Sequence, residues 1–181
     1  MGYRIASYIF AFAIFTVLMP AALGAAEAPF GDKVSAAITY YNRAAPGIAT
    51  AGLIQGNGVV EAKGLGFKVL VDLRGPAEGL EAERAAAKRV GLTYVNIPVT
   101  TRIPTDDQVR TFARVIDNAA NHPVLVHCQS ANRAGAMWAL YRASKGVPGE
   151  IAIEEGRATG LTSREPAVRV KLGLAPVKKT P

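Results

Sequence analysis

Short apolar segments alternate with helix-forming segments along this chain, and no other feature restricts its fold as much. Residues 67–73 (FKVLVDL) are nearly all apolar and rich in branched side chains, and residues 123–127 (PVLVH) form a short apolar segment, as is typical of strands covered on both faces. Helix-forming segments lie at 78–90, 105–116 and 134–144. Strands that alternate with helices of this length build βαβ units. The sequence therefore predicts a three-layer α/β fold, with helices flanking a mostly parallel sheet of four or five strands.

Weaker patterns complete this organisation within a single domain, the number expected for 181 residues. We expect short strands at 51–55 and 94–98, a short helix at 58–65, and two more short helices at 148–160 and 165–172. The resulting division is an irregular lead-in at 27–50, a folded domain at 51–174 and a flexible tail at 175–181.

The first 26 residues have the order of a secretory signal peptide: one positive charge, an apolar run at 5–19, then small residues. Gly24 and Ala26 fit cleavage before Glu27. The apolar run is shorter than the roughly 20 residues of a spanning helix. We expect a periplasmic or secreted protein with no stable membrane span after cleavage; the alternative is an uncleaved segment that anchors the chain to the inner membrane.

The composition excludes several kinds of protein. Cys128 is the only cysteine and there are two histidines, so a disulfide scaffold is excluded and a structural zinc site is disfavoured. We expect no metal and no cofactor. The net charge is +7, but the basic residues are scattered without interleaved aromatics, so nucleic acid is not an expected partner.

One segment carries the candidate chemistry. An apolar strand ends at His127, Cys128 follows, and Arg133 comes directly before an apolar helix predicted from Ala134. The four residues between Cys128 and Arg133 form a short loop: Gln129, Ser130, Ala131 and Asn132. Ligands bind beyond the carboxyl ends of parallel strands, and helix N-termini attract anions. The same field stabilises a thiolate, and a guanidinium can hold two oxygens of an oxyanion. The pattern predicts a reactive thiol in an anion-binding loop.

This segment resembles the cysteine-dependent protein phosphatases. With Arg74 after the strand VLVDL, YVNIP at 94–98, PVLVHCQSANRAGAMWALYRA at 123–143 and the acidic run at 154–158, the chain resembles one bacterial branch of them. That branch is the beta-lactamase hydrolase-like protein phosphatase-like domain family, which has the dual-specificity phosphatase fold. The resemblance covers residues 51–173.

The resemblance implies a mechanism and a substrate class. Cys128 would attack phosphorus to form a phosphocysteine, while Arg133 and the N–H groups of residues 129–133 would hold the phosphate oxygens. The substrate would be a phosphorylated small molecule or protein. His127 would support the loop, and Arg74 would provide either a second anion contact or a structural ion pair.

Two departures from the phosphatase pattern keep other functions open. Four residues separate Cys128 from Arg133, one fewer than in most tyrosine phosphatases and the same number as in rhodanese-like sulfurtransferases. The loop at 99–102, where such phosphatases carry an acidic residue, has none, and the nearest candidates for a general acid are Asp106 and Asp107, which also suit helix capping. The alternatives are a sulfurtransferase and a non-catalytic module that binds anions or senses oxidation.

Overall fold

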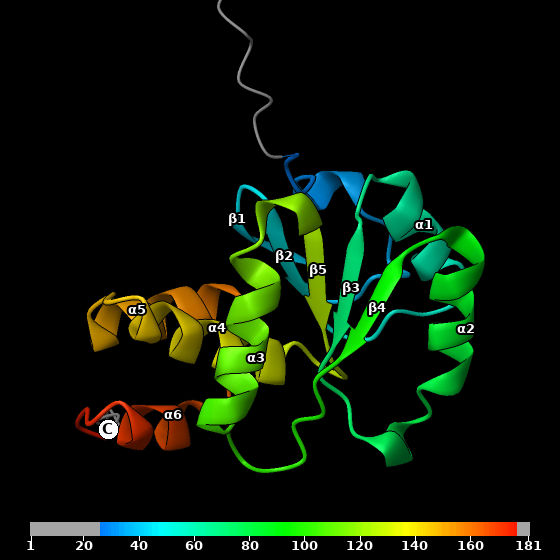
Figure 1. Cartoon of the computed structure of the whole chain (residues 1–181). Coiled ribbons are helices and arrows are strands. Elements are labelled where there is room, and N and C mark those ends of the chain that lie inside the picture. The colour runs from blue at the N-terminus through cyan, green and yellow to red at the C-terminus, as the bar shows by residue number, and fades with distance from the viewer. Residues whose placement is uncertain (1–25, 177–181) are drawn as a thin grey trace, which may run out of the picture.

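A five-stranded sheet forms the centre of the fold, with strand order β1-β2-β5-β3-β4 (Figure 1). Neighbouring strands pair in parallel except at one edge, where β1 runs antiparallel to β2. The strands are β1 (Asn42–Ala45), β2 (Ile48–Ala51), β3 (Val69–Asp72), β4 (Thr93–Asn96) and β5 (Val124–His127). The predicted α/β fold with a mostly parallel sheet is confirmed.

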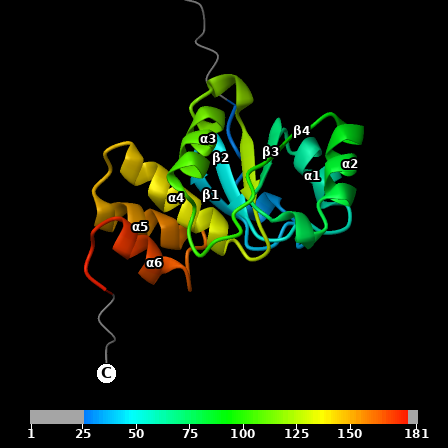
Figure 2. The same ribbon diagram turned by 60° about the horizontal axis from the view of Figure 1, so that its bottom comes forward.

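Helices cover both faces of this sheet, which gives the predicted three layers (Figures 1 and 2). One face is covered by α1 and α2, the other by α3 and α4, and α5 and α6 pack outside α4. The helices are α1 (Gly58–Gly64), α2 (Glu81–Val90), α3 (Asp106–Ile116), α4 (Asn132–Ser144), α5 (Gly149–Ala158) and α6 (Glu165–Lys171).

The central strands divide their side chains between two apolar cores. Val69 and Val71 of β3 and Val126 of β5 pack with α3 and α4, whereas Leu70 and Leu125 face α1 and α2. Successive side chains of a strand point to opposite faces, so a strand buried on both faces must be apolar throughout. This is why both strands are apolar in the sequence up to the buried Asp72 and His127 at their carboxyl ends.

The structure is a computed structural model that describes residues 26–176. Residues 1–25 of the predicted signal peptide and residues 177–181 of the predicted tail lie outside the described residues. Within the described part, no helix is long and apolar enough to cross a membrane.

The predicted lead-in at 27–50 was wrong in one respect, because it is not irregular throughout. It contains β1 and most of β2, joined by a turn at Pro46-Gly47, and the strand expected at 51–55 lies at 48–51 instead. Alanines dominate this hairpin and have a low preference for strands, so the local pattern was weak. Pairing of β2 with β5 and complete burial of β2 select the strand conformation.

The helix after the candidate site begins at Asn132, two residues earlier than predicted. Arg133 therefore lies in its first turn and not before it. Ala131 has a left-handed backbone (φ 60°) and ends the loop, so the helix starts immediately after it. The helix expected at 78–90 likewise begins at Glu81, because residues 76–78 form a separate 3-10 turn.

Glycines bring α4 and the end of α5 into very close contact. A methyl group on Gly135 would lie 2.2 Å from the Leu161 nitrogen and 2.7 Å from the Gly156 oxygen. These neighbours are backbone atoms, which cannot rotate away. The contact fixes the loop after α5 against the first turn of α4.

Gly135→Ala should lower the free energy of unfolding by about 1–3 kcal/mol or more, because the added methyl group forces the backbones apart. The control is Gly64→Ala in α1, where a methyl group meets no atom within 4 Å. That control should gain about 0.5–1 kcal/mol from helix propensity. Urea denaturation measures both values, and a neutral Gly135→Ala would contradict the close packing.

Candidate active site

Cys128 lies at the carboxyl end of β5, which is flanked by β2 and β3. Its N–H donates to the Ala51 carbonyl at 3.3 Å, which continues the pairing of β5 with β2. Its side chain is 1% exposed and packs within the core that contains α4. The nucleophile candidate is therefore held on the rigid centre of the sheet.

The backbone of the loop after Cys128 is available to bind an anion. Gln129 and Ser130 are exposed, and within the described chain the N–H groups of residues 129–131 donate to no other protein group. The left-handed backbone of Ala131 turns the chain directly into the N-terminus of α4, which has 13 residues. Unpaired N–H groups and the positive end of a helix dipole both favour a bound anion.

Close packing at Ala131 supports this turn from outside. Gly160 has φ +108°, and a methyl group there would lie 2.4 Å from the Ala131 methyl carbon. Glycine at position 160 thus makes room for alanine in the loop.

Arg133 is buried and held on one side by Glu78. Its Nη1 and Nη2 atoms donate to the two carboxylate oxygens of Glu78, each at 2.6 Å. This hydrogen bonding, together with the nearby Cys128 sulfur, raises the pKa of Arg133 against the effect of burial. Glu78 therefore fixes the orientation of the guanidinium, and Cys128 is among the groups near it. In return, Arg133 holds the pKa of Glu78 below its usual value.

Asn132 ties the Cys128 loop to the segment between α5 and α6. Its Oδ1 accepts from the N–H groups of Thr162 (2.9 Å) and Arg164 (3.4 Å), and its Nδ2 donates to Ser163 Oγ at 2.8 Å. Asn132 thus positions neighbouring backbone and leaves anion binding to the loop itself.

His127 and Arg74 belong to a buried charged cluster beneath the loop. Arg74 donates to Asp72 (Nη2 to Oδ2, 2.8 Å) and pairs with Glu83 at 3.0 Å. The Nε2 of His127 lies 2.8 Å from Glu83 Oε1, without the alignment of a hydrogen bond. All four side chains are buried. Of the two roles considered for Arg74, the structure shows the structural ion pair.

Asp72 is ionised in this cluster despite its burial. Burial raises its pKa, but hydrogen bonds from Arg74, the nearby His127 and a 2.6 Å hydrogen bond donated by the Tyr94 hydroxyl together lower it below the ordinary value. A buried carboxylate is stable only with such partners.

The same cluster contains the one group of potential metal ligands in the described chain: Asp72, Glu83 and His127, with ligand atoms within 4.8 Å of one another. Two carboxylates and an imidazole are suitable donors for a divalent cation. The guanidinium of Arg74, however, is bonded to both carboxylates and already supplies the positive charge. The arrangement fits an ion-pair cluster better than a metal site.

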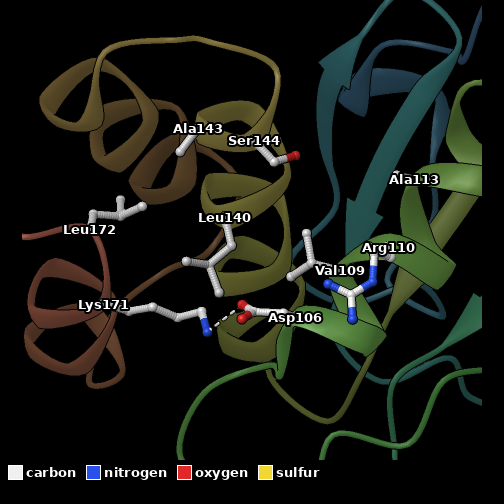
Figure 3. Close-up of a pocket in the computed structure, with 9 residues that line it drawn as sticks. All are labelled: Asp106, Val109, Arg110, Ala113, Leu140, Ala143, Ser144, Lys171 and Leu172. Atoms are coloured by element: carbon white, nitrogen blue, oxygen red, sulfur yellow. Dashed lines mark ion pairs between the residues drawn. The ribbon is translucent and has the colours of Figure 1, made fainter.

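Asp106 and Asp107 do not join the Cys128 loop. Asp106 pairs with Lys171 at 2.6 Å beside a groove of about 410 Å³ between α3, α4 and α6 (Figure 3). This pairing lowers the pKa of Asp106, whereas a general acid needs a raised pKa. Asp107 is exposed and pairs with Arg110. Thr105 caps α3, and both aspartates lie in its first turn, as the capping alternative predicted.

A second hollow, of about 550 Å³, lies directly beside the Cys128 loop. Ser130 and Ala131 form one side of it, and Tyr40, which is 69% exposed, lies at another. The rest of its lining comes from residues 41–42 and from the end of α5 and the loop that follows. This hollow offers room for the part of a substrate beyond its anionic group.

Sequence reasoning missed Glu78, the partner of Arg133, and Glu83, the partner of His127. The sequence has no direct signal for Glu83, because Asp72, a lone charge in an otherwise apolar strand, indicates only that cationic side chains such as Arg74 are buried nearby. Glu78 had a weak signal: it follows the carboxyl end of β3, at the same sheet edge as Arg133.

A cysteine at the end of a central parallel strand, followed by a loop with unpaired N–H groups and an arginine in the first turn of the next helix, is the arrangement of the phosphatase-like class of the dual-specificity type. The profile of one family of this class, described as "DSP-PTPase phosphatase fused to NAD+ Kinase", matches residues 59–167, and the chain belongs to that family.

Individual relatives agree with this assignment. A Beta-lactamase hydrolase-like protein of Xylella fastidiosa is 35% identical over 100 residues, which confirms the predicted resemblance. The match covers 52% of this chain and 22% of that relative. The fold is similar to that of a DUF442 protein of Shewanella putrefaciens CN-32 (TM-score 0.58, 23% identity, 75% of this chain and 92% of that chain). It is also similar to P. aeruginosa TpbA in complex with pTyr (TM-score 0.60, 20% identity, 84% and 99%).

Asp72→Asn should lower the free energy of unfolding at pH 7 by about 3–5 kcal/mol, because it leaves Arg74 buried without its main partner. The folded-state pKa of Asp72 is lowered, so its stabilisation is complete above its unfolded pKa of about 3.9 and is lost as the pH falls through the folded value. The gap between wild type and variant should therefore narrow below about pH 4.

Denaturation at several pH values measures this gap, with exposed Asp107→Asn as the control, expected within about 0.5 kcal/mol of wild type. A gap that stays constant from neutral to strongly acidic pH would mean that Asp72 is not the stabilising charge of the cluster.

Proposed function

We propose that this protein is a cysteine-dependent phosphatase that forms a phosphocysteine on Cys128. The observation that carries the proposal is the convergence of three groups at the N-terminus of α4: the Cys128 sulfur, the unpaired N–H groups of residues 129–131 and the guanidinium of Arg133. Membership of a DSP-PTPase family supports it.

The reaction has two steps. In the first, the Cys128 sulfur forms a bond to phosphorus while the bond to the leaving oxygen breaks, and the leaving group takes the electron pair. In the second, water attacks phosphorus, the sulfur–phosphorus bond breaks, and phosphate is released with the thiolate restored. Through both steps, the loop N–H groups and Arg133 hold the three remaining phosphoryl oxygens, where negative charge develops.

Glu78 has a positioning role in this mechanism. It accepts from Nη1 and Nη2 of Arg133, and the guanidinium has five N–H donors in all. Nη1 also donates to the carbonyls of Leu73 and Val99, each at 3.4 Å. Within the described chain, the Nε–H group and the second N–H of Nη2 have no partner and are available for a phosphoryl oxygen. The Glu78 carboxylate is bound to Arg133 and has a lowered pKa, so it is unsuited to donate a proton to the leaving group.

The substrate class that we propose is a phosphorylated small molecule or protein whose body occupies the hollow beside Ser130 and Tyr40. TpbA, which has a similar fold, was solved with pTyr. Aryl phosphates are therefore suitable first probes.

Cys128→Ser should abolish hydrolysis of phenyl phosphate, and Arg133→Lys should lower kcat/KM by about 10²–10³, since a point charge replaces oriented oxyanion donors. The control is Gln129→Ala, which leaves the N–H group of this exposed residue in place and should change kcat/KM by less than about threefold. Steady-state kinetics measure all four proteins. Turnover that survives Cys128→Ser would refute the phosphocysteine.

The four-residue spacing between Cys128 and Arg133 favours one competing function, a sulfurtransferase in which Cys128 carries a persulfide. Thiosulfate would transfer its outer sulfur to the thiolate and leave as sulfite. On the phosphatase account, intact-mass measurement after thiosulfate treatment should show no added sulfur on wild type. A stoichiometric adduct that Cys128→Ser lacks would favour the sulfurtransferase instead.

A further inference from the structure

Two arginines beside the Cys128 loop have an unusual set of partners. Arg164 Nη1 donates to the carbonyls of Thr101 (2.7 Å) and Arg102, and Arg102 Nη2 donates to the Ser163 carbonyl at 2.5 Å. Within residues 26–176, neither guanidinium forms an ion pair with a carboxylate. The two side chains lock two loops together through backbone oxygens and keep their positive charges uncompensated.

Other arginines of helices α4, α5 and α6 form ion pairs with carboxylates. Arg142 pairs with Glu155, Arg157 with Glu154 and Glu165, and Arg169 with Glu150. Within the described chain, Arg102 in the loop after β4 and Arg164 in the loop before α6 have no such partner. Arg114 of α3 also lacks a carboxylate, but it is exposed and donates to Thr111 of its own helix.

Contacts place both arginines next to the phosphate-binding groups. Asn132, in the first turn of α4, accepts from the N–H group of Arg164. Arg133 Nη1 lies 3.4 Å from the carbonyl of Val99, and Arg164 Nη1 donates to that of Thr101, two residues further along the same loop.

Electrostatics agree with this placement. Burial lowers the pKa of Arg164, the charge of Arg133 lowers it further, and the Cys128 sulfur raises it. Glu78, also nearby, is engaged by Arg133. The charges of Arg133, Arg164 and Arg102 therefore make the electrostatic potential positive from the Cys128 loop to residues 101–102 and 163–164.

The loop after β4 thus offers a positive charge where a proton donor was sought. Residues 99–104 contain no carboxylate. A phenol such as tyrosine has a pKa of about 10, whereas the second pKa of a phosphate monoester is about 6. A leaving phosphate therefore needs no proton at neutral pH, and arginine suits its oxygens well.

We propose that Arg102 and Arg164 form a second phosphate subsite and that the preferred substrate is a phosphoanhydride. This inference rests on the proposed phosphatase activity. The terminal phosphoryl group lies in the Cys128 loop, and the next phosphate lies on the two arginines. The sulfur bonds to the terminal phosphorus, the bond to the bridging oxygen breaks, and the second phosphate leaves with the electron pair. Water then cleaves the sulfur–phosphorus bond, and its spare proton goes to the solvent.

The test compares kcat/KM for inorganic pyrophosphate and phenyl phosphate. Wild type should prefer pyrophosphate by at least about tenfold, and Arg164→Gln should reduce that preference by about tenfold or more, as expected for loss of a charged hydrogen bond. Arg102→Gln should act in the same direction, and Arg164→Lys should restore part of the preference. The control, Arg114→Gln, removes an exposed arginine of α3 and should change neither rate.

The outcomes separate the two proposals. If wild type hydrolyses neither compound, the phosphatase function fails and the subsite fails with it. If phenyl phosphate is hydrolysed in a Cys128-dependent way but pyrophosphate is not preferred, only the subsite is overturned. If Arg164→Gln lowers both rates equally, Arg164 acts through loop structure alone, and the subsite is likewise overturned.

Discussion

The ion pair between Arg133 and Glu78 is the interaction on which the candidate site depends most. It joins the first turn of α4 to the 3-10 turn after β3, two segments that only the parallel pairing of β3 and β5 brings together. Arginine is flexible and carries several donors, so without a fixed partner it would lose its orientation toward Cys128. Glu78 supplies that partner while leaving other guanidinium donors available.

Two groups of charged side chains lie near the Cys128 loop, and they differ in whether their charges are compensated. Below the loop, Asp72, Arg74, Glu83 and His127 form a buried cluster in which the charges compensate one another and hold the carboxyl ends of β3 and β5 together. In the loops beside Cys128, the guanidinium groups of Arg102 and Arg164 donate, within residues 26–176, only to backbone carbonyl oxygens. The buried cluster stabilises the fold, and we propose that Arg102 and Arg164 bind substrate.

The sequence predicted the fold class and the loop between β5 and α4 well, because both follow from local patterns. Two strands buried on both faces must be apolar, and the order from His127 to Arg133 marks a loop between such a strand and a helix. The alanine-rich hairpin of β1 and β2 could not be read in this way, since burial and pairing with β5 determine it. The partners Glu78 and Glu83 lie far from Cys128 in the sequence, and only the packing of the chain brings them near.

The central claim is a covalent phosphate on Cys128, and trapping it is the most direct test. The protein would be mixed with phenyl phosphate, quenched with acid within the first turnover, digested, and analysed by mass spectrometry. The account predicts a phosphoryl group on the peptide that contains Cys128, and its absence from Cys128→Ser. Phosphate release by wild type with no phosphorylated Cys128 peptide at any time point, and equal release by Cys128→Ser, would contradict the account.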